Sequence, residues 1–462
     1  MISVYSGHCG IKSRDSLLCA IMMLSASFVL ADQQNIAIEA SSTWTARSPR
    51  DEIRPQFTTT ADGGPSNGAC LVITHDDREG LDGWFQKSFE ISGGEIYCFQ
   101  AFRKTDNVEL ARRSALVRIL WQDELGKLVS ADVTEAQVKE LGHVPTAEPE
   151  HPVDGQTDED GWTEVSGVYR APSHAVRALV ELHLQWAPSG SVKWAEIQFS
   201  KSDSIARRPV RLASIHHKPK GKSARDNCLE YEHLIADAAR QKADLVVMGE
   251  TIPSVGAALK PHEIAESVPG ATTDYFGKLA KKHSIHLVLS LYERSGHLVY
   301  NTGVLIGPDG NLIGKYRKVC LPHGEVEKGV APGTTYPVFD TSFGKVGIMV
   351  CYDGFFPEVA RELSNNGAEV IAWPVWGCNP LLAQARACEN HVYIVSSTFM
   401  APEDGWMYSA IFDQTGKLVA KAEIWGTVVI AEVDLNRPYI GPWNLGDFHS
   451  MIPRHRPVSL GR

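Results

Sequence analysis

The chain has 462 residues, of which 43% are hydrophobic and 22% are charged, and its formal net charge is -10 at pH 7. This composition is that of a globular protein long enough for about two or three domains, each with its own core. The negative charge, together with the lack of a Lys/Arg stripe interleaved with aromatic residues, argues against nucleic acid as a partner.

The first 31 residues differ from the rest of the chain. Lys12 and Arg14 precede the apolar run "SLLCAIMMLSASFVLA", which is short for a membrane span, and Ala31 with Val29 two before it suits signal-peptidase cleavage. We therefore predict a signal peptide over residues 1–31 and an exported protein, periplasmic or secreted. An uncleaved N-terminal membrane anchor is the alternative.

Cysteine usage agrees only in part with export. The chain has nine cysteines, and without Cys9 and Cys19 an odd number remains, so at least one thiol stays free. Cys70 and Cys98 lie in strand-like runs and could pair, although their spacing does not require it. No CxxC motif or Cys/His cluster has zinc-site spacing, so we expect no metal site.

Residues 32–204 have the sequence pattern of a β domain. Short runs rich in β-branched and aromatic residues alternate with Gly, Asp, Asn and Ser, which predicts a β-sandwich of jelly-roll-like type. The acidic stretch 148–161 is predicted to be an exposed loop. The predicted strands are "ACLVITH", "WFQKSFEI", "EIYCFQAFRK", "ALVRILWQ", "WTEVSGVYRA", "AVRALVELHLQW" and "KWAEIQFS".

Five of the six tryptophans in this domain raise the question of a ligand. Buried core positions are the favoured interpretation, and a platform on which sugars stack is the alternative. Polysaccharide is therefore a candidate partner of the N-terminal domain. The residues are Trp84, Trp121, Trp162, Trp186 and Trp194.

From residue 205 to the end, strands and helices alternate, which predicts an α/β layered domain over 205–462. The predicted strands are 210–217, 243–250, 285–294, 345–351 and 368–374, with a hairpin through 307–318. The predicted helices are 224–242, 271–284 and 356–366, and a further helix and strand lie around 381–397.

Three predicted strands of this domain end near chemically reactive residues, Glu250, Lys318 and Cys351. Sites in open α/β sheets form at the C-terminal ends of strands. Taken singly, each residue has an ordinary structural explanation: a strand-end carboxylate, a solvated basic edge and a small buried side chain. At a strand-to-helix junction, however, the helix N-terminus should favour the thiolate of Cys351, and Glu250 and Lys318 could assist as base and cation.

The combination resembles the nitrilase superfamily of carbon-nitrogen hydrolases. A strand-end Glu, then "YRK", then "GxxxCYD" followed by "FPE" occur in that order, and the resemblance extends over residues 208–456 through "NTGVLIGPDGNLIGKYRK", "ARACENHVYIV" and "RHRP". It implies an α-β-β-α sandwich, a catalytic triad of Glu250, Lys318 and Cys351, no cofactor, and a homo-oligomer, dimeric or larger.

The resemblance also implies a further glutamate in the loop after the lysine, which positions that lysine and the substrate. The loop "LPHGEVEKGVAPG" offers Glu325 and Glu327, and we slightly prefer Glu327 because it stands in an "EK" pair. One departure is Cys320, since the family often has His two residues after the lysine.

The function implied is hydrolysis of a nonpeptide carbon-nitrogen bond in a small amide or N-carbamoyl compound, or of a nitrile, through a thioester on Cys351. Glu250 would move protons, while Lys318 and the backbone N–H of Tyr352 would stabilise the oxyanion. A hypothesis from another class is a secreted glycan-binding protein with an inactive hydrolase-like scaffold. It requires a missing triad member, and none is missing.

Overall fold

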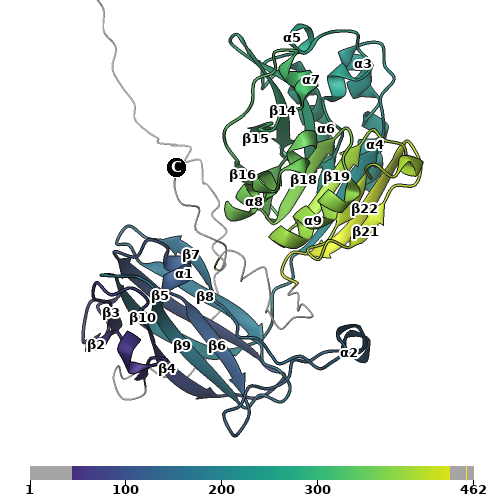
Figure 1. Cartoon of the computed structure of the whole chain (residues 1–462). Coiled ribbons are helices and arrows are strands. Elements are labelled where there is room, and N and C mark those ends of the chain that lie inside the picture. The colour runs from purple at the N-terminus through teal and green to yellow at the C-terminus, as the bar shows by residue number, and fades with distance from the viewer. Residues whose placement is uncertain (1–43, 438–453, 455–462) are drawn as a thin grey trace, which may run out of the picture. The chain divides into compact units, whose positions relative to one another are not determined.

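The computed structural model describes residues 44–437 and residue 454 (Figure 1). The predicted signal peptide lies outside these residues. The motif "RHRP" also lies outside them, except for its first residue, Arg454. Within the described part, no helix is long and apolar enough to cross a membrane.

Two antiparallel sheets are built from residues 45–202. One has four strands in the order β1-β4-β9-β6, and the other has six in the order β2-β3-β10-β5-β8-β7. The strands are β1 (Thr45–Arg47), β2 (Gln56–Thr60), β3 (Cys70–Thr74), β4 (Asp82–Glu90), β5 (Ile96–Asp106), β6 (Val117–Gln122), β7 (Val153–Thr157), β8 (Thr163–Arg170), β9 (Arg177–Gln185) and β10 (Ser191–Ser202). The helices are η1 (Asp51–Ile53), α1 (Ala111–Ser114) and α2 (Glu135–Leu141).

One hydrophobic core joins the two sheets. Val180 and Leu182, two residues apart on β9, belong to the same buried cluster as Phe99 and Ala101, two residues apart on β5. This period of two is what a strand shows when one face packs inward. The pairing of two sheets over one core explains why the sequence of this part reads as short alternating strands.

The five tryptophans considered as a platform differ in exposure. Trp121, Trp162 and Trp194 are buried, whereas Trp84 is partly buried and stacks on the His183 ring. Trp186 is 50% exposed and has a φ of 53°, a left-handed backbone conformation that is rare for a bulky residue. The core interpretation therefore fits three of the five residues, and Trp186 has the exposure that a stacking platform needs.

The acidic stretch 148–161 was expected to be a loop, but the structure has a strand within it. β7 pairs with β8 at the edge of the six-stranded sheet, and all five of its residues are exposed. An edge strand that buries no side chain carries no hydrophobic alternation, so its sequence pattern is that of a loop.

The α/β half contains two six-stranded sheets, in the orders β15-β14-β13-β12-β11-β22 and β16-β17-β18-β19-β20-β21. The strands of the first are β11 (Pro209–His216), β12 (Leu245–Val247), β13 (His286–Ser295), β14 (Leu298–Ile306), β15 (Leu312–Arg317) and β22 (Thr427–Asp434). Those of the second are β16 (Val338–Asp340), β17 (Lys345–Ile348), β18 (Val370–Val375), β19 (Tyr393–Thr398), β20 (Ala410–Phe412) and β21 (Leu418–Lys421).

Helices cover the outer faces of both sheets, which gives the four layers of an α-β-β-α sandwich (Figure 1). On β11, Leu212 shares a buried cluster with Ile348 of β17, whereas Ala213 shares one with Leu234 and Phe276 on two helices. The helices are α3 (Ala224–Leu229), α4 (Glu232–Arg240), α5 (Pro261–Ile264), α6 (Ala271–His283), α7 (His323–Val326), α8 (Pro357–Asn365), α9 (Pro380–Asn390), η2 (Ile252–Ser254), η3 (Cys351–Phe355) and η4 (Pro402–Asp404).

The centre of each sheet is parallel, and this places the site. β11, β12 and β13 run parallel in the first sheet, as do β17, β18 and β19 in the second. Two predicted elements differ in detail: the helix expected over 224–242 divides into α3 and α4, and the strand expected over 345–351 ends at Ile348. The C-terminal ends of parallel strands gather at one edge, so loops after them can meet.

Candidate active site

Glu250 lies just beyond the end of β12, at a sharp bend of the chain. The next residue, Thr251, has a φ of 42°, which is unfavourable for a β-branched side chain, and its N–H donates to Ser290 Oγ at 2.7 Å. The carboxylate is 5% exposed, and its Oε2 accepts the backbone N–H of Trp376 at 3.0 Å. The strained turn directs a buried carboxylate into the space between the strand ends.

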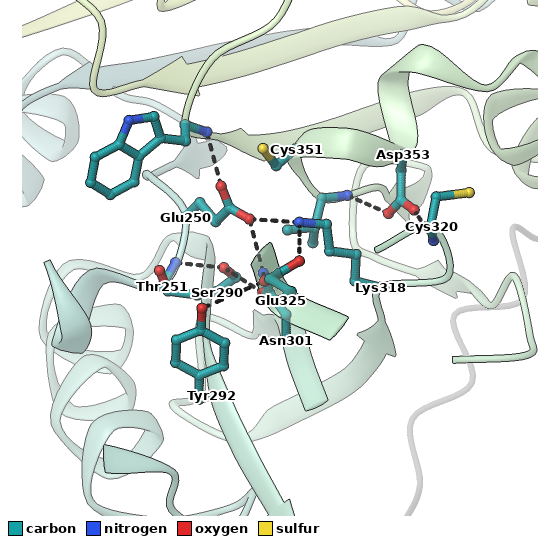
Figure 2. Close-up of polar contacts among 12 residues, drawn as sticks. Glu250, Thr251, Ser290, Tyr292, Asn301, Lys318, Cys320, Glu325, Cys351 and Asp353 are labelled. Atoms are coloured by element: carbon teal, nitrogen blue, oxygen red, sulfur yellow. Dashed lines mark hydrogen bonds and ion pairs between the residues drawn. The ribbon is translucent and has the colours of Figure 1, made fainter. Parts of the chain in front are cut away.

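Lys318 follows β15 and is 1% exposed (Figure 2). Its Nζ is 3.0 Å from Glu250 Oε1 and 2.7 Å from Glu325 Oε2. Burial lowers the pKa of the ammonium, but the nearby Glu250 and Glu325 carboxylates raise it more, and the net shift is upward. Lys318 is therefore a fixed positive charge and cannot act as a base near neutral pH.

Cys351 begins the turn η3 with a φ of 45°, and its carbonyl accepts the Trp373 Nε1–H at 3.2 Å. The expectation that a helix dipole stabilises its thiolate was wrong, because η3 is a short 3₁₀ turn and α8 begins only at Pro357. Burial raises the pKa of the thiol, Glu250 raises it further, and Lys318 lowers it in part. The resting side chain is thus a thiol beside a carboxylate.

Of the two loop glutamates, the structure selects Glu325. Glu325 is 9% exposed and contacts Lys318, whereas Glu327 has a 64% exposed side chain and pairs with His323 at 3.0 Å. The preference for Glu327 was therefore wrong: Glu325, within α7, contacts the lysine, whereas Glu327 directly follows the helix and its side chain is exposed. The role of the Tyr352 N–H, which follows Cys351 directly, stays a prediction.

Two residues complete the site that the sequence did not single out as functional. Asn301 on β14 is fully buried and donates from Nδ2 to Glu250 Oε1 and to Glu325 Oε1, each at 2.8 Å (Figure 2). Trp376 contributes the N–H to Glu250. Asn301 opens the "NTGV" motif, but its spacing from the lysine does not reveal that it bridges two carboxylates.

Asp353 joins the lysine loop to the cysteine turn. Its carboxylate is fully buried and accepts the N–H of Cys320 at 2.8 Å (Figure 2). It also accepts the N–H of Val350 at 2.9 Å and the Tyr316 hydroxyl at 2.8 Å. Burial raises the pKa of Asp353 to about 6, although these donors lower it in part. Its contacts make it a structural support of the site, since all three partners belong to the two segments that carry Lys318 and Cys351.

The cysteines and possible metal ligands of the described residues give two further findings. Seven cysteines there are free, and these include Cys70 and Cys98, which do not pair. Among the same residues, no group of three or more His, Cys, Asp or Glu side chains is arranged to hold a metal ion.

Comparison with known proteins identifies the family. Residues 211–442 match the family model of carbon-nitrogen hydrolases. The chain is 35% identical to a nitrilase of Pyrococcus abyssi over 238 residues, and the matched region covers 49% of this chain and 90% of that protein. It is 31% identical to the omega-amidase NIT2 of Homo sapiens over 255 residues, and the matched region covers 50% of this chain and 88% of that protein.

The chain therefore belongs to the carbon-nitrogen hydrolase family of the nitrilase superfamily, as its motifs predicted, and is an enzyme of that kind. A solved structure of Nit3 from Saccharomyces cerevisiae, a member of branch 10 of the superfamily, is 26% identical and has a TM-score of 0.45. It covers 50% of this chain and 93% of that chain.

Proposed function

We propose that this enzyme hydrolyses small amides through a thioester on Cys351, with Glu250 as the proton carrier and Lys318 as the stabilising cation. The observation that carries the proposal is the convergence of three side chains from three separate strand ends, with Lys318 Nζ 3.0 Å from Glu250 Oε1 and the Glu250 carboxylate beside the Cys351 thiol. The omega-amidase activity in the name of the human relative supports the same class of substrate.

The proton transfer follows from the environment of the thiol. Because the pKa of Cys351 is raised, the proton leaves sulfur as the bond to the amide carbon forms, and the Glu250 carboxylate receives it. The negative charge that develops on the amide oxygen is stabilised by Lys318 and by the Tyr352 N–H. Such a donor contributes about 3 kcal/mol to the transition state.

The second half of the reaction reverses these roles. Glu250 passes its proton to the departing nitrogen, so that ammonia or an amine leaves and a thioester remains. The same carboxylate then accepts a proton from water, whose oxygen attacks the thioester carbon and releases the acid and the free thiol. An N-carbamoyl compound would need the same groups, and a nitrile would need a second addition of water.

The experiment is ammonia release by the purified protein from a panel of ω-amides, simple amides, N-carbamoyl compounds and nitriles. We expect turnover on amides, and loss of it in the Cys351→Ser variant, because oxygen at nearly the same volume is a poorer nucleophile here. No release from any compound of the panel would favour the alternative of an inactive scaffold. Unchanged release by the variant would remove Cys351 from the mechanism.

For the N-terminal part we propose glycan binding at Trp186. A surface hollow of about 520 Å³ is lined by Trp186, Arg113, Asn107 and Glu109, and the Arg113 guanidinium lies 5.3 Å from the Trp186 ring centroid. An exposed ring with polar neighbours suits the apolar face and hydroxyl rim of a sugar. Retention on insoluble polysaccharides should fall in Trp186→Ala and persist in Trp425→Ala, a control at another exposed tryptophan.

We also propose that the protein is exported with cleavage after Ala31, and that it forms a homo-oligomer. The support for export is the apolar segment and small-residue site at the N-terminus. Fractionation of expressing cells and the mass of the mature protein test export, with a mature N-terminus at Asp32 as the expected result. Light scattering of the purified protein tests the oligomeric state.

A further inference from the structure

One amide side chain holds both carboxylates of the catalytic centre. Asn301 uses its two N–H groups on Glu250 Oε1 and Glu325 Oε1, while Lys318 binds Glu250 Oε1 and Glu325 Oε2 from the other direction (Figure 2). Two glutamates therefore share one lysine and one asparagine. All four side chains are buried, with Asn301 at 0% exposure.

The orientation of that amide is set by a short chain of hydrogen bonds. Ser290 Oγ accepts the Thr251 N–H at 2.7 Å, so the hydroxyl proton is left to donate to Asn301 Oδ1, 3.3 Å away. With Oδ1 engaged by Ser290, the amide nitrogen must face the glutamates. The chain begins at Thr251, the residue after Glu250, so the same network fixes the strained bend and the carboxylate beside it.

This arrangement makes the two oxygens of Glu250 unequal. Oε1 accepts from both Asn301 and Lys318, which fills its two lone-pair directions, whereas Oε2 accepts the Trp376 N–H. The remaining acceptor site is on Oε2. The proton of Cys351 therefore has one available position on the carboxylate.

We propose that Asn301 is a positioning residue of this enzyme: it holds Glu250 and Glu325 side by side around Lys318 and reserves Glu250 Oε2 for the Cys351 proton. In the step concerned, the S–H bond breaks, an O–H bond forms on Oε2, and sulfur bonds to the substrate carbon. The inference rests on the proposed function, because it assigns a role within the same reaction.

Charge explains why the amide donors matter. Two carboxylates and one ammonium leave a net negative charge in a buried space. Further titratable groups within electrostatic reach of these three are Tyr292, Cys320, Cys351 and Asp353. The N–H groups of Asn301 offset part of the negative charge that Glu250 presents to Cys351, and that charge, together with burial, raises the pKa of the thiol. Without these donors the thiol would ionise at a higher pH, so its reactivity would require a higher pH.

The test compares Asn301→Asp and Asn301→Leu with Thr302→Val. Asp removes the donors and adds charge, and Leu removes the donors alone. Thr302 is the adjacent buried residue of β14 but bonds to Glu293 at 2.8 Å, so its variant controls for disturbance of the strand. Two quantities are measured against pH: kcat and KM on an amide, and the rate of Cys351 alkylation by iodoacetamide, followed by mass spectrometry.

We expect kcat to fall about 10- to 100-fold in both Asn301 variants with a smaller change in KM, as the loss of charge-assisted hydrogen bonds implies. The rising limbs of the kcat and alkylation profiles should move up by about one pH unit or more. Thr302→Val should keep the parent profiles. The alkylation measurement needs no substrate, so it tests the role of Asn301 even if no amide of the panel is hydrolysed.

Folded Asn301 variants with the parent's alkylation rates and pH profiles would overturn the proposal and leave Asn301 a purely structural residue. If neither variant folds, Ser290→Ala decides. It keeps the amide but removes the hydroxyl that orients it, and should shift the alkylation profile in the same direction by a smaller amount. An unshifted profile in Ser290→Ala would then count against the proposal.

Discussion

Two acidic residues two positions apart have very different environments, and this makes a matched test of the site. Glu325→Gln removes one of the two carboxylates that contact the buried Lys318 ammonium, whereas Glu327→Gln changes an exposed partner of His323. We expect turnover of the preferred amide to fall at least about 10-fold in the first variant, because the lysine loses a partner in a desolvated place. Activity close to the parent's is expected in the second. The reverse order would restore the assignment of Glu327.

A second residue-scale prediction concerns acid stability. Glu293 on β13 is 1% exposed; burial raises its pKa, but hydrogen bonds from Arg317, Lys315 and Thr302 outweigh this and lower the pKa to about 2. The unfolded carboxyl titrates near about 4.3, so the ionised group stabilises the fold above that pH, by about 3 kcal/mol, and the contribution is lost as pH falls through about 2.

Urea unfolding of the parent and of Glu293→Gln measures this contribution. The parent should be the more stable protein at pH 7, and the difference between the two should shrink steadily below pH 4. Carboxylates elsewhere titrate in both proteins and so cancel in the comparison. A difference that does not change with pH would show that Glu293 contributes packing alone.

At the scale of elements, helix α9 supports the turn that carries Cys351. Arg386 on α9 is 5% exposed and donates to the carbonyls of Gly354 and Phe355, in and at the end of η3, at 3.2 and 3.3 Å. Arg386→Met keeps much of the apolar stem and leaves two carbonyls unpaired, which should cost about 2 to 4 kcal/mol of unfolding free energy and lower kcat.

The control for Arg386 is Arg361→Met on α8. Arg361 also donates to a backbone carbonyl, but that carbonyl belongs to Glu389 on α9 and not to η3. Unfolding free energy from denaturant curves and kcat are measured for both variants. If Arg361→Met reduces kcat as much as Arg386→Met does, a general destabilisation of the helical layer explains the lower kcat. The loss of the hydrogen bonds to η3 would then not be its cause.

The elements near the site also show what the sequence could and could not predict. Strand ends at Glu250, Lys318 and Cys351 were visible because apolar runs stop there and the motifs follow in order. The form of the turn after Cys351 was not visible, since it depends on tertiary contact: a Cβ on Gly354 would lie 2.0 Å from the Trp373 ring. The roles of Glu325 and Asn301 were hidden for the same reason, because each is defined by residues distant in the chain.

For the whole molecule, the edge strand β7 and the exposed Trp186 were the least predictable features, since neither buries the side chains that give a strand or a core its pattern. The family assignment was the most predictable, because the strand-end Glu and the "YRK", "GxxxCYD" and "FPE" motifs can be recognised in order from the sequence alone, and all four lie within the matched residues 211–442. The two halves also have separate buried clusters. That of the first half ends at Phe199, and those of the second begin at Val210 and Ala213.

The separate cores lead to a prediction about how the halves divide the work. Every residue assigned to chemistry lies after residue 205, so a fragment of residues 205–462 should hydrolyse a small soluble amide with kcat and KM within about threefold of the full-length values. Retention on polysaccharide should be lost with the first half. If the acidic segment around Asp158, Glu159 and Asp160 instead covers the entrance to the site, kcat and KM should both change. The kinetics are compared after circular dichroism and thermal unfolding have shown that the fragment is folded. A folded but inactive fragment would place part of the active site in the N-terminal half. It would contradict the prediction that the two halves work independently.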